Sequence, residues 1–205
     1  IASEMSANIA HELNQPLTAI SMYAQACRNL LKKGPLDNQA LLPTLSRIDK
    51  QAQRAGAIIR NIRTLVGKQN PHHELTDINR LIKNTIKLAQ VDVNCRAIRF
   101  ECDFFEQLPM IEIVLGQIQQ VILNLIRNAC DAMITTSADQ KYITVISENH
   151  PVGFITIRVR DRGIGINRDH NDKLFRAFFS TKSYGMGMGL AISHSIISNH
   201  GGEMK

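Results

Sequence analysis

Apolar residues in the first part of the chain recur at alternating steps of three and four, the spacing that keeps one side of a long helix apolar. One such series covers residues 9–30 and a second covers residues 41–66. Between them, Gly34 and Pro35 end a helix, because glycine accepts a left-handed cap and proline cannot continue the backbone hydrogen bonding. The pattern predicts a helical hairpin over residues 1–68.

A single hairpin of this kind leaves its apolar seam in water. Two copies that pair bury both seams in a four-helix bundle, so we expect a homodimer. Pro16 falls inside the first helix, where it removes a backbone donor and predicts a kink. His11 stands one turn earlier, between the core positions Ile9 and Leu13, and its angle around the helix turns the imidazole away from the seam. We therefore expect an exposed histidine.

The pattern changes after the second helix. Residues 69–76 lack periodicity and are expected to form a linker to a second domain over residues 77–205. Asp77 is a candidate N-cap for a helix reaching about residue 91. Further helical spacing covers residues 117–134 and 189–199, and β-rich runs lie near 96–104, 110–115, 142–149 and 153–160. This order predicts an α+β sandwich, one sheet with helices packed on one face.

Composition narrows the function classes. The chain has 205 residues, 44% of them hydrophobic, but no apolar run approaches the roughly 18 residues of a membrane span. We expect no membrane contact by this segment and a cytoplasmic location, with any anchor of the full-length protein elsewhere. The net charge of +6 comes from scattered Lys and Arg without a basic block, so nucleic acid is not an expected partner. A phosphate-bearing ligand or an acidic protein explains the charge equally well.

The cysteines show no spacing typical of a metal site. None of them forms a CxxC pair, and no histidine stands at metal-finger spacing beside them. We expect reduced core thiols in a cytosolic protein. The four residues are Cys27, Cys95, Cys102 and Cys130.

Two asparagines and two glycine-rich stretches are candidates for a nucleotide site. Asn124 and Asn128 are four residues apart and share a helix face with Asp131. Amide oxygens suit Mg²⁺, and glycines let backbone N–H groups approach phosphate before a helix N-terminus. Residues 166–184, between the glycine stretches, are long for a plain loop, which favours a functional lid. Singly, each feature also fits a polar helix stripe or an ordinary turn.

Five motifs follow one another along the chain. They are His11-Glu12-Leu-Asn-Gln15-Pro16-Leu, Asn124-Leu-Ile-Arg-Asn128-Ala-Cys-Asp131, Asp161-Arg-Gly163-Ile-Gly165, Leu174-Phe175-Arg-Ala-Phe178-Phe179-Ser-Thr181-Lys182 and Gly185-Met-Gly187-Met-Gly189-Leu190. In this order they resemble the H, N, G1, F and G2 boxes of the sensor histidine kinases of two-component systems. The residues of the first and last motifs are most similar to those of the branch that contains oxygen-sensing and dicarboxylate-sensing kinases.

The resemblance implies a function and a set of residues. Residues 77–205 would adopt the GHKL (Bergerat) ATP-binding fold, C-terminally truncated relative to the strands that family members usually add. The γ-phosphoryl group of Mg·ATP would pass to His11, with Glu12 as base or orienting group, and then to an aspartate of a response regulator. Asn128 would hold the metal. The implied nucleotide-binding residues are Asn124, Asn128, Asp131, Asp161, Gly163, Gly165, Phe178, Thr181, Lys182, Gly185, Gly187, Gly189 and Leu190.

Two positions bear on the kind of reaction. Related ATPases of the gyrase and chaperone type carry a catalytic glutamate at the position of Asn124, and an amide cannot act as that base, which favours transfer over hydrolysis. Gln15 stands where many family members carry Thr or Asn to orient water for dephosphorylation of the regulator. Gln can also position a water, but it reaches further. The alternatives are a GHKL-type ATPase and a non-catalytic dimerisation or nucleotide-binding signalling module.

Overall fold

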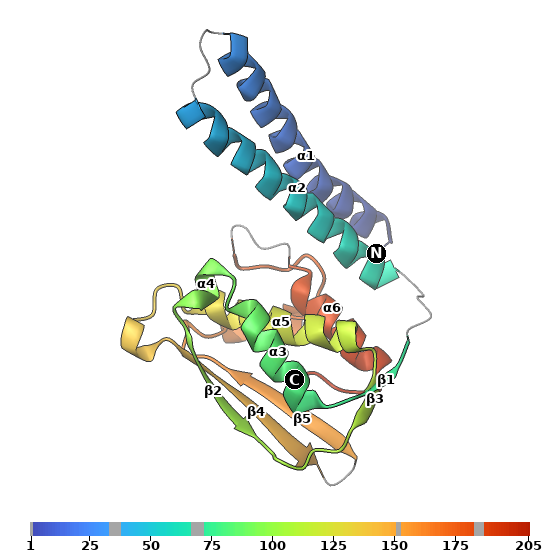
Figure 1. Ribbon diagram of the computed structural model, residues 1–205. Helices are drawn as coiled ribbons and strands as arrows, with labels where there is room; N and C mark the ends of the chain where they lie inside the picture. Colours follow the sequence, from blue (N-terminus) through green and yellow to red (C-terminus); the bar gives the residue numbers. More distant parts are fainter. Residues whose placement is uncertain (1, 33–37, 67–71, 151–152, 183–186) are drawn as a thin grey trace. The chain divides into compact units, whose positions relative to one another are not determined.

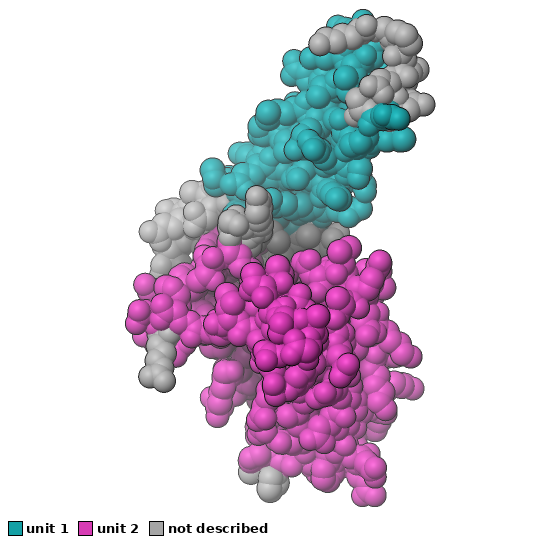
Figure 2. Space-filling model, turned by 90° about the vertical axis from the view of Figure 1, so that its left-hand side faces the viewer, with its two compact units in different colours: residues 1–68 teal, residues 69–205 magenta. Residues whose placement is uncertain are grey.

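A computed structural model describes residues 2–32, 38–66, 72–150, 153–182 and 187–205. The chain divides into two compact units, residues 1–68 and residues 69–205, which Figure 2 colours separately. Among the described residues, none of the helices has both the length and the apolar character that crossing a bilayer requires.

Unit 1 is a hairpin of two long helices. Helix α1 (Ala2–Lys32) and helix α2 (Asn38–Val66) lie side by side along their length (Figure 1), which confirms the hairpin read from the apolar spacing. The predicted turn at residues 34–38 falls mostly outside the described residues. Helix α1 is continuous through Pro16, whose side chain is buried. Among the described side chains of the hairpin, the large apolar ones left exposed are those of Leu17, Met22, Leu31, Leu42, Leu45 and Ile59.

Unit 2 contains two small sheets where a single sheet was expected. The larger has the order β2-β4-β5, with β2 (Arg99–Phe104) parallel to β4 (Tyr142–His150) and β4 antiparallel to β5 (Phe154–Arg160). The smaller pairs β1 (Glu74–Thr76) with β3 (Ile111–Ile113), antiparallel. Strand β1 thus occupies the end of the stretch that was expected to be only a linker.

Three helices cover one face of the larger sheet (Figure 1): α3 (Ile78–Ala89), α5 (Leu115–Ala132) and α6 (Gly189–Asn199). Asp77 caps α3 as expected, because its Oδ1 accepts from the backbone N–H of Arg80 at 3.0 Å. The core between helices and sheet includes the buried side chains of Ile82, Ile122, Ile126, Ile143 and Val145. The α+β sandwich is confirmed.

Three short helices were not expected. The four-residue α4 (Val93–Arg96) follows α3, a 3-10 turn η1 (Ala138–Gln140) precedes β4, and a second, η2 (Arg168–Lys173), lies inside the stretch predicted to be a lid. The predicted lid therefore has local structure of its own.

The prediction of reduced thiols is wrong for one pair of cysteines. Cys95 in α4 and Cys130 in α5 are joined by a disulfide, and both are fully buried. The two residues are 35 positions apart, so only the folded chain brings them together. Cys27, buried, and Cys102, exposed, are free thiols.

Candidate functional site

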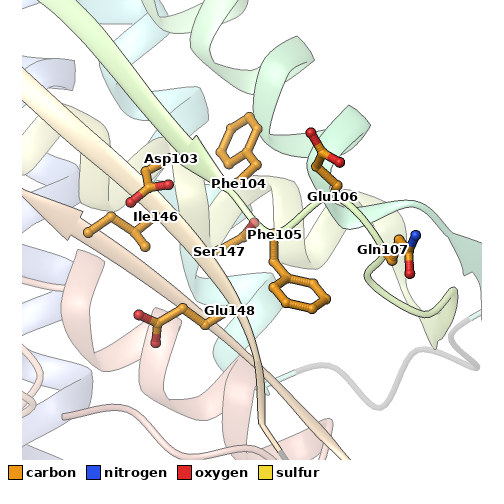
Figure 3. A pocket seen from close by; sticks show the side chains of 8 residues that line it. All are labelled: Asp103, Phe104, Phe105, Glu106, Gln107, Ile146, Ser147 and Glu148. Carbon is orange, nitrogen blue, oxygen red and sulfur yellow. The ribbon is translucent and has the colours of Figure 1, made fainter.

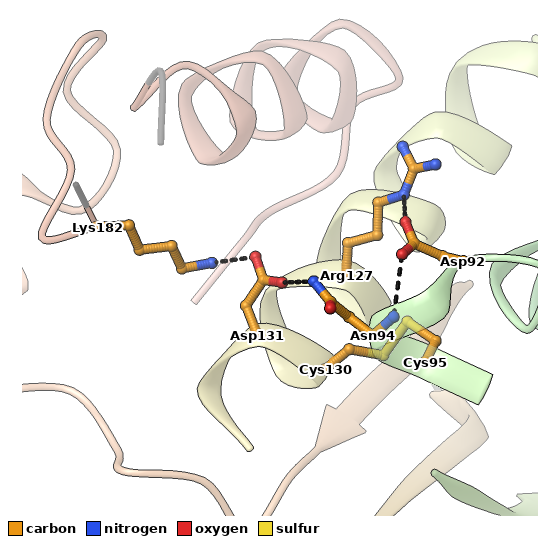
Figure 4. The surroundings of a disulfide bond; sticks show 7 residues. All are labelled: Asp92, Asn94, Cys95, Arg127, Cys130, Asp131 and Lys182. Atoms are coloured by element: carbon orange, nitrogen blue, oxygen red, sulfur yellow. Dashed lines mark hydrogen bonds and ion pairs between the residues drawn. A yellow bond between two sulfur atoms is a disulfide. The ribbon is translucent and has the colours of Figure 1, made fainter. Parts of the chain in front are cut away.

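Side chains of α5 converge on one lysine. The Lys182 ammonium donates to Asp131 Oδ2 at 2.8 Å, drawn in Figure 4, and to Asn128 Oδ1 at 3.2 Å. Asn128 and Asp131 are half-buried on neighbouring turns of the helix. The fold thus brings two of the predicted α5 residues to the predicted lysine. The side-chain oxygens of both α5 residues accept hydrogen bonds from its charged ammonium group.

Asn124 lies one turn earlier on α5 and contacts a different element. Its Nδ2 donates to Ser193 Oγ of α6 at 3.0 Å, and Ser193 is buried. A Cβ on Gly189 would lie only 2.4 Å from Asn124 Oδ1, so this glycine allows the start of α6 to pack on the asparagine. Ser193 was not found from the sequence, where the only signal is a polar residue within the apolar spacing of α6. The next predicted residue, Leu190, is half-buried in the first turn of α6.

The turn after β5 docks on the C-terminal end of α5. Asp161 is exposed, and its Oδ1 accepts from the backbone N–H of Gly163 at 2.8 Å, which fixes the turn locally. The N–H of Ile164 donates to the carbonyl of Ala132 at 3.2 Å. A Cβ on Gly163 would lie 2.6 Å from that carbonyl oxygen, so only glycine fits this approach. Gly165 has a φ of 72°, which favours glycine as well.

The F-box and G2 stretches lie against each other. Gly187 has a φ of 61°, and a Cβ there would lie 2.5 Å from the backbone of Phe178 and Phe179. Phe178 itself has a φ of 67°, a strained conformation for a residue with a side chain. Thr181 is exposed. Gly185 lies outside the described residues.

His200 ties the start of α5 to the end of α6. Its Nε2 accepts from the backbone N–H of Val114 at 3.1 Å, and its Nδ1 then carries the proton and donates to the Ile196 carbonyl at 2.8 Å. The sequence offered no partner for this histidine. Its role is structural.

His11 is exposed on α1, as predicted. The Gln15 amide lies one turn away, with its Nε2 3.2 Å from His11 Nε2. Because an amide N–H donates, the hydrogen bond requires a lone pair on Nε2 and the ring proton on Nδ1. Glu12 is half-buried, and its Oε2 has no hydrogen-bond partner among the described residues. Within the described residues of α1, no hydrogen bond joins the Glu12 carboxylate to the His11 imidazole.

Two open surface hollows lie outside the nucleotide motifs. One, of about 380 Å³, runs along α1 from His11 and is lined by His11, Asn14, Gln15, Thr18, Ala19 and Met22. The other, of about 470 Å³, lies at the end of β2 beside β4 and is shown in Figure 3. It contains three carboxylates and none of the motif residues; its lining is Asp103, Phe104, Phe105, Glu106, Gln107, Ile146, Ser147 and Glu148.

Comparison with known proteins places both units in described families. Residues 1–71 match the His Kinase A (phospho-acceptor) domain, and residues 114–205 match the histidine kinase-, DNA gyrase B-, and HSP90-like ATPase family. The chain belongs to the sensor histidine kinases. The kinase chain therefore combines a phosphoacceptor-type hairpin with an ATPase-type domain.

Individual relatives agree with this assignment. The kinase chain is 39% identical to the sensor protein FixL of Bradyrhizobium diazoefficiens, over 98% of this chain and 40% of FixL. It is 33% identical to the C4-dicarboxylate transport sensor protein DctS of Rhodobacter capsulatus, over 98% of this chain and 30% of DctS. The solved complex of histidine kinase ThkA with response regulator protein TrrA superposes with a TM-score of 0.73 at 25% identity, covering 97% of this chain and 55% of that one. The chain thus spans well under half of these two curated relatives.

Proposed function

We propose that this chain is the catalytic core of a cytoplasmic sensor kinase, which transfers the γ-phosphoryl group of ATP to His11 and relays it to an aspartate of a response regulator. The observation that carries the proposal is the contact of Lys182 with Asn128 and Asp131 of α5, in a chain that also presents an exposed histidine. Phosphoryl transfer needs charge neutralisation and positioning more than covalent help from the protein.

The oxygens of α5 fit a hard metal ion. The Asn128 amide oxygen and the Asp131 carboxylate already hold the Lys182 ammonium, and such oxygens are the ligands that Mg²⁺ prefers. Asn128 is the residue proposed to hold the metal. When bound, Mg²⁺ neutralises charge on the phosphates. Lys182 and Thr181 are proposed to contact phosphate from the other side.

The glycine segments and Asp161 are proposed to recognise the rest of the nucleotide. The carboxylate of Asp161 is exposed and can accept from an exocyclic amine while its turn remains closed. Gly165, Gly187 and Gly189 carry no side chain that would keep their backbone N–H groups from a phosphate. Gly185 is proposed to act with them.

His11 is proposed to react as a neutral imidazole. With the proton on Nδ1, the lone pair on Nε2 is the nucleophile, and the Gln15 amide that holds Nε2 must move aside before attack. Glu12 is proposed to orient the ring or take its proton, and we propose that Gln15 later positions a water.

Incubation with γ-³²P-ATP tests this function. Label on the protein should be labile to acid, stable to base and lost in His11→Gln. The matched control is His150→Gln, which replaces another exposed histidine, at the end of β4, and should label normally. Label retained in His11→Gln would refute the acceptor site, and steady phosphate release without any label would favour an ATPase.

Nucleotide binding is tested separately. Asn128→Ala should weaken binding of a fluorescent ATP analogue in Mg²⁺, whereas Asn149→Ala, at an exposed asparagine of β4, should not. Equal affinity in both variants would remove Asn128 from the site.

We also propose a homodimer through the hairpin and docking of a receiver domain beside His11. The exposed apolar residues of α1 and α2 support pairing, and the hollow along α1 offers a surface next to the acceptor. Sedimentation equilibrium on the intact chain should give twice the monomer mass. A monomer at micromolar concentration would contradict the pairing.

A further inference from the structure

Helix α4 is tied to α5 at three places, which Figure 4 shows together. Arg127 Nε lies 3.6 Å from Asp92 Oδ2, Asn94 Nδ2 donates to Asp131 Oδ1 at 3.2 Å, and Cys95 is joined to Cys130. Only the last link is covalent. Its α5 residue, Cys130, lies in the sequence between Asn128 and Asp131, the two residues that bind Lys182.

Helix α4 is short, and Cys95 is the only one of its four residues that is buried. Val91, just before the helix, and Val93, its first residue, are 72% and 78% exposed. Short elements with few buried contacts open locally at low free-energy cost. Both polar links to α5 lie at the surface, where an ion pair or hydrogen bond contributes little. The disulfide is therefore the main constraint that keeps α4 on α5.

Helix α4 supplies one of the two partners that hold the Asp131 carboxylate. Asn94 binds one oxygen of this carboxylate and Lys182 binds the other, so the group is held from two sides. If α4 moves away from α5, Asp131 loses its hydrogen bond with Asn94 and retains the one with Lys182. The positions of Asp131 and Asn128 around the lysine are then less fixed. The ordering of these groups must then be restored when a ligand binds, which lowers affinity.

We propose that Cys95–Cys130 is a thiol–disulfide modification site that sets the nucleotide affinity of this domain, the oxidised form binding more tightly. The inference rests on the proposed function of the domain. In the reducing step, a thiolate of a protein or small-molecule dithiol attacks one sulfur, the S–S bond breaks, and the second thiol of the reductant closes its own disulfide. Two electrons and two protons pass to the kinase, which gains two thiols.

Both sulfurs are buried, so a reductant reaches them when α4 opens. The Asp92–Arg127 pair opposes this opening only weakly, because it is exposed. Reduction by dithiothreitol should therefore be faster in Arg127→Gln than in the parent chain, but by no more than about fivefold. The matched control is Arg158→Gln, which breaks the surface pair with Glu148 on the sheet and should leave the rate unchanged.

The central experiment compares the oxidised and reduced chain without any mutation. Mass spectrometry after alkylation should find Cys95 and Cys130 linked in the untreated protein and both alkylated after dithiothreitol and unfolding. Calorimetric titration with a non-hydrolysable ATP analogue and Mg²⁺ should show affinity at least about fivefold higher in the oxidised form, the lower end of typical coupling between sites. Cys95→Ser should bind like the reduced chain and ignore dithiothreitol, while Cys102→Ser should keep the full response.

The outcomes separate two failures. Equal affinity in both redox forms, or no Cys95–Cys130 link in the untreated chain, overturns the redox proposal alone. If neither form binds the nucleotide, the proposed function fails and the redox proposal with it.

Discussion

Gly163→Ala tests how closely the G1 turn must approach α5. The added Cβ would lie 2.6 Å from both the carbonyl oxygen and the Cβ of Ala132, whereas ordinary contact begins at 3.4 Å. Because the clash is with the backbone and Cβ of Ala132, which cannot rotate away, the turn must move by roughly 1 Å, an overpacking change that costs about 1–3 kcal/mol. The hydrogen bond from Ile164 to Ala132, worth about 0.5–1.5 kcal/mol, is lost with it. The lower entropy of the unfolded alanine chain offsets about 0.4–1 kcal/mol. We expect unit 2 to lose about 2–3 kcal/mol.

Differential scanning calorimetry of the intact chain measures this loss in the transition of unit 2, and the fluorescent ATP analogue measures affinity. The matched control is Gly116→Ala, since Gly116 is a helical glycine of α5 and an added Cβ there would meet no atom within 4 Å outside its chain neighbours and its own helix backbone. That change should stabilise α5 by about 0.5–1 kcal/mol. If Gly163→Ala is as stable as Gly116→Ala and binds nucleotide equally well, the close approach has no structural role.

Three further changes have defined outcomes. Gly187→Ala should cost more than about 2 kcal/mol by calorimetry, because it adds left-handed strain to a backbone clash. Asn124→Ala should cost about 1–3 kcal/mol, since buried Ser193 loses its partner; an unchanged melting temperature would contradict this. Cys102 is exposed overall, but partial desolvation of its thiol raises the pKa, against the opposing charge of Lys83. Alkylation by iodoacetamide should therefore rise at higher pH in the native chain than in urea. The raised thiol pKa stabilises the folded chain at pH values below the thiol pKa of the unfolded chain. This contribution is lost as the pH rises through the thiol pKa of the folded chain.

Local patterns in the sequence were enough to predict most elements. The spacing of three and four specified both helices of unit 1, and the N-cap at Asp77 and the helix over 117–134 were each found within one or two residues. Strand β1 was missed because three residues are too short to show alternation, and its partner β3 is supplied by distant sequence. The same limit hid α4, which has a single turn and little periodicity.

The candidate site was predicted as a set of residues but not as a set of contacts. The sequence pointed to Asn124, Asn128 and Asp131 as one helix face, yet Asn124 binds α6 while the other two bind Lys182. Lysine and carboxylate are 51 positions apart, so their pairing depends on the whole fold. The Cys95–Cys130 link was missed for the same reason.

Helix α5 is fastened at its beginning by His200, in its middle by Ser193 and at its end by the turn of Gly163. Helix α5 therefore contacts segments that are far apart in the sequence. Loss of any one of these contacts should shift α5, so double-mutant cycles between the segments should give coupling energies of about 0.5–3 kcal/mol rather than simple additivity. Within unit 2, α6 and the turn after β5 are therefore expected to respond together to changes in α5.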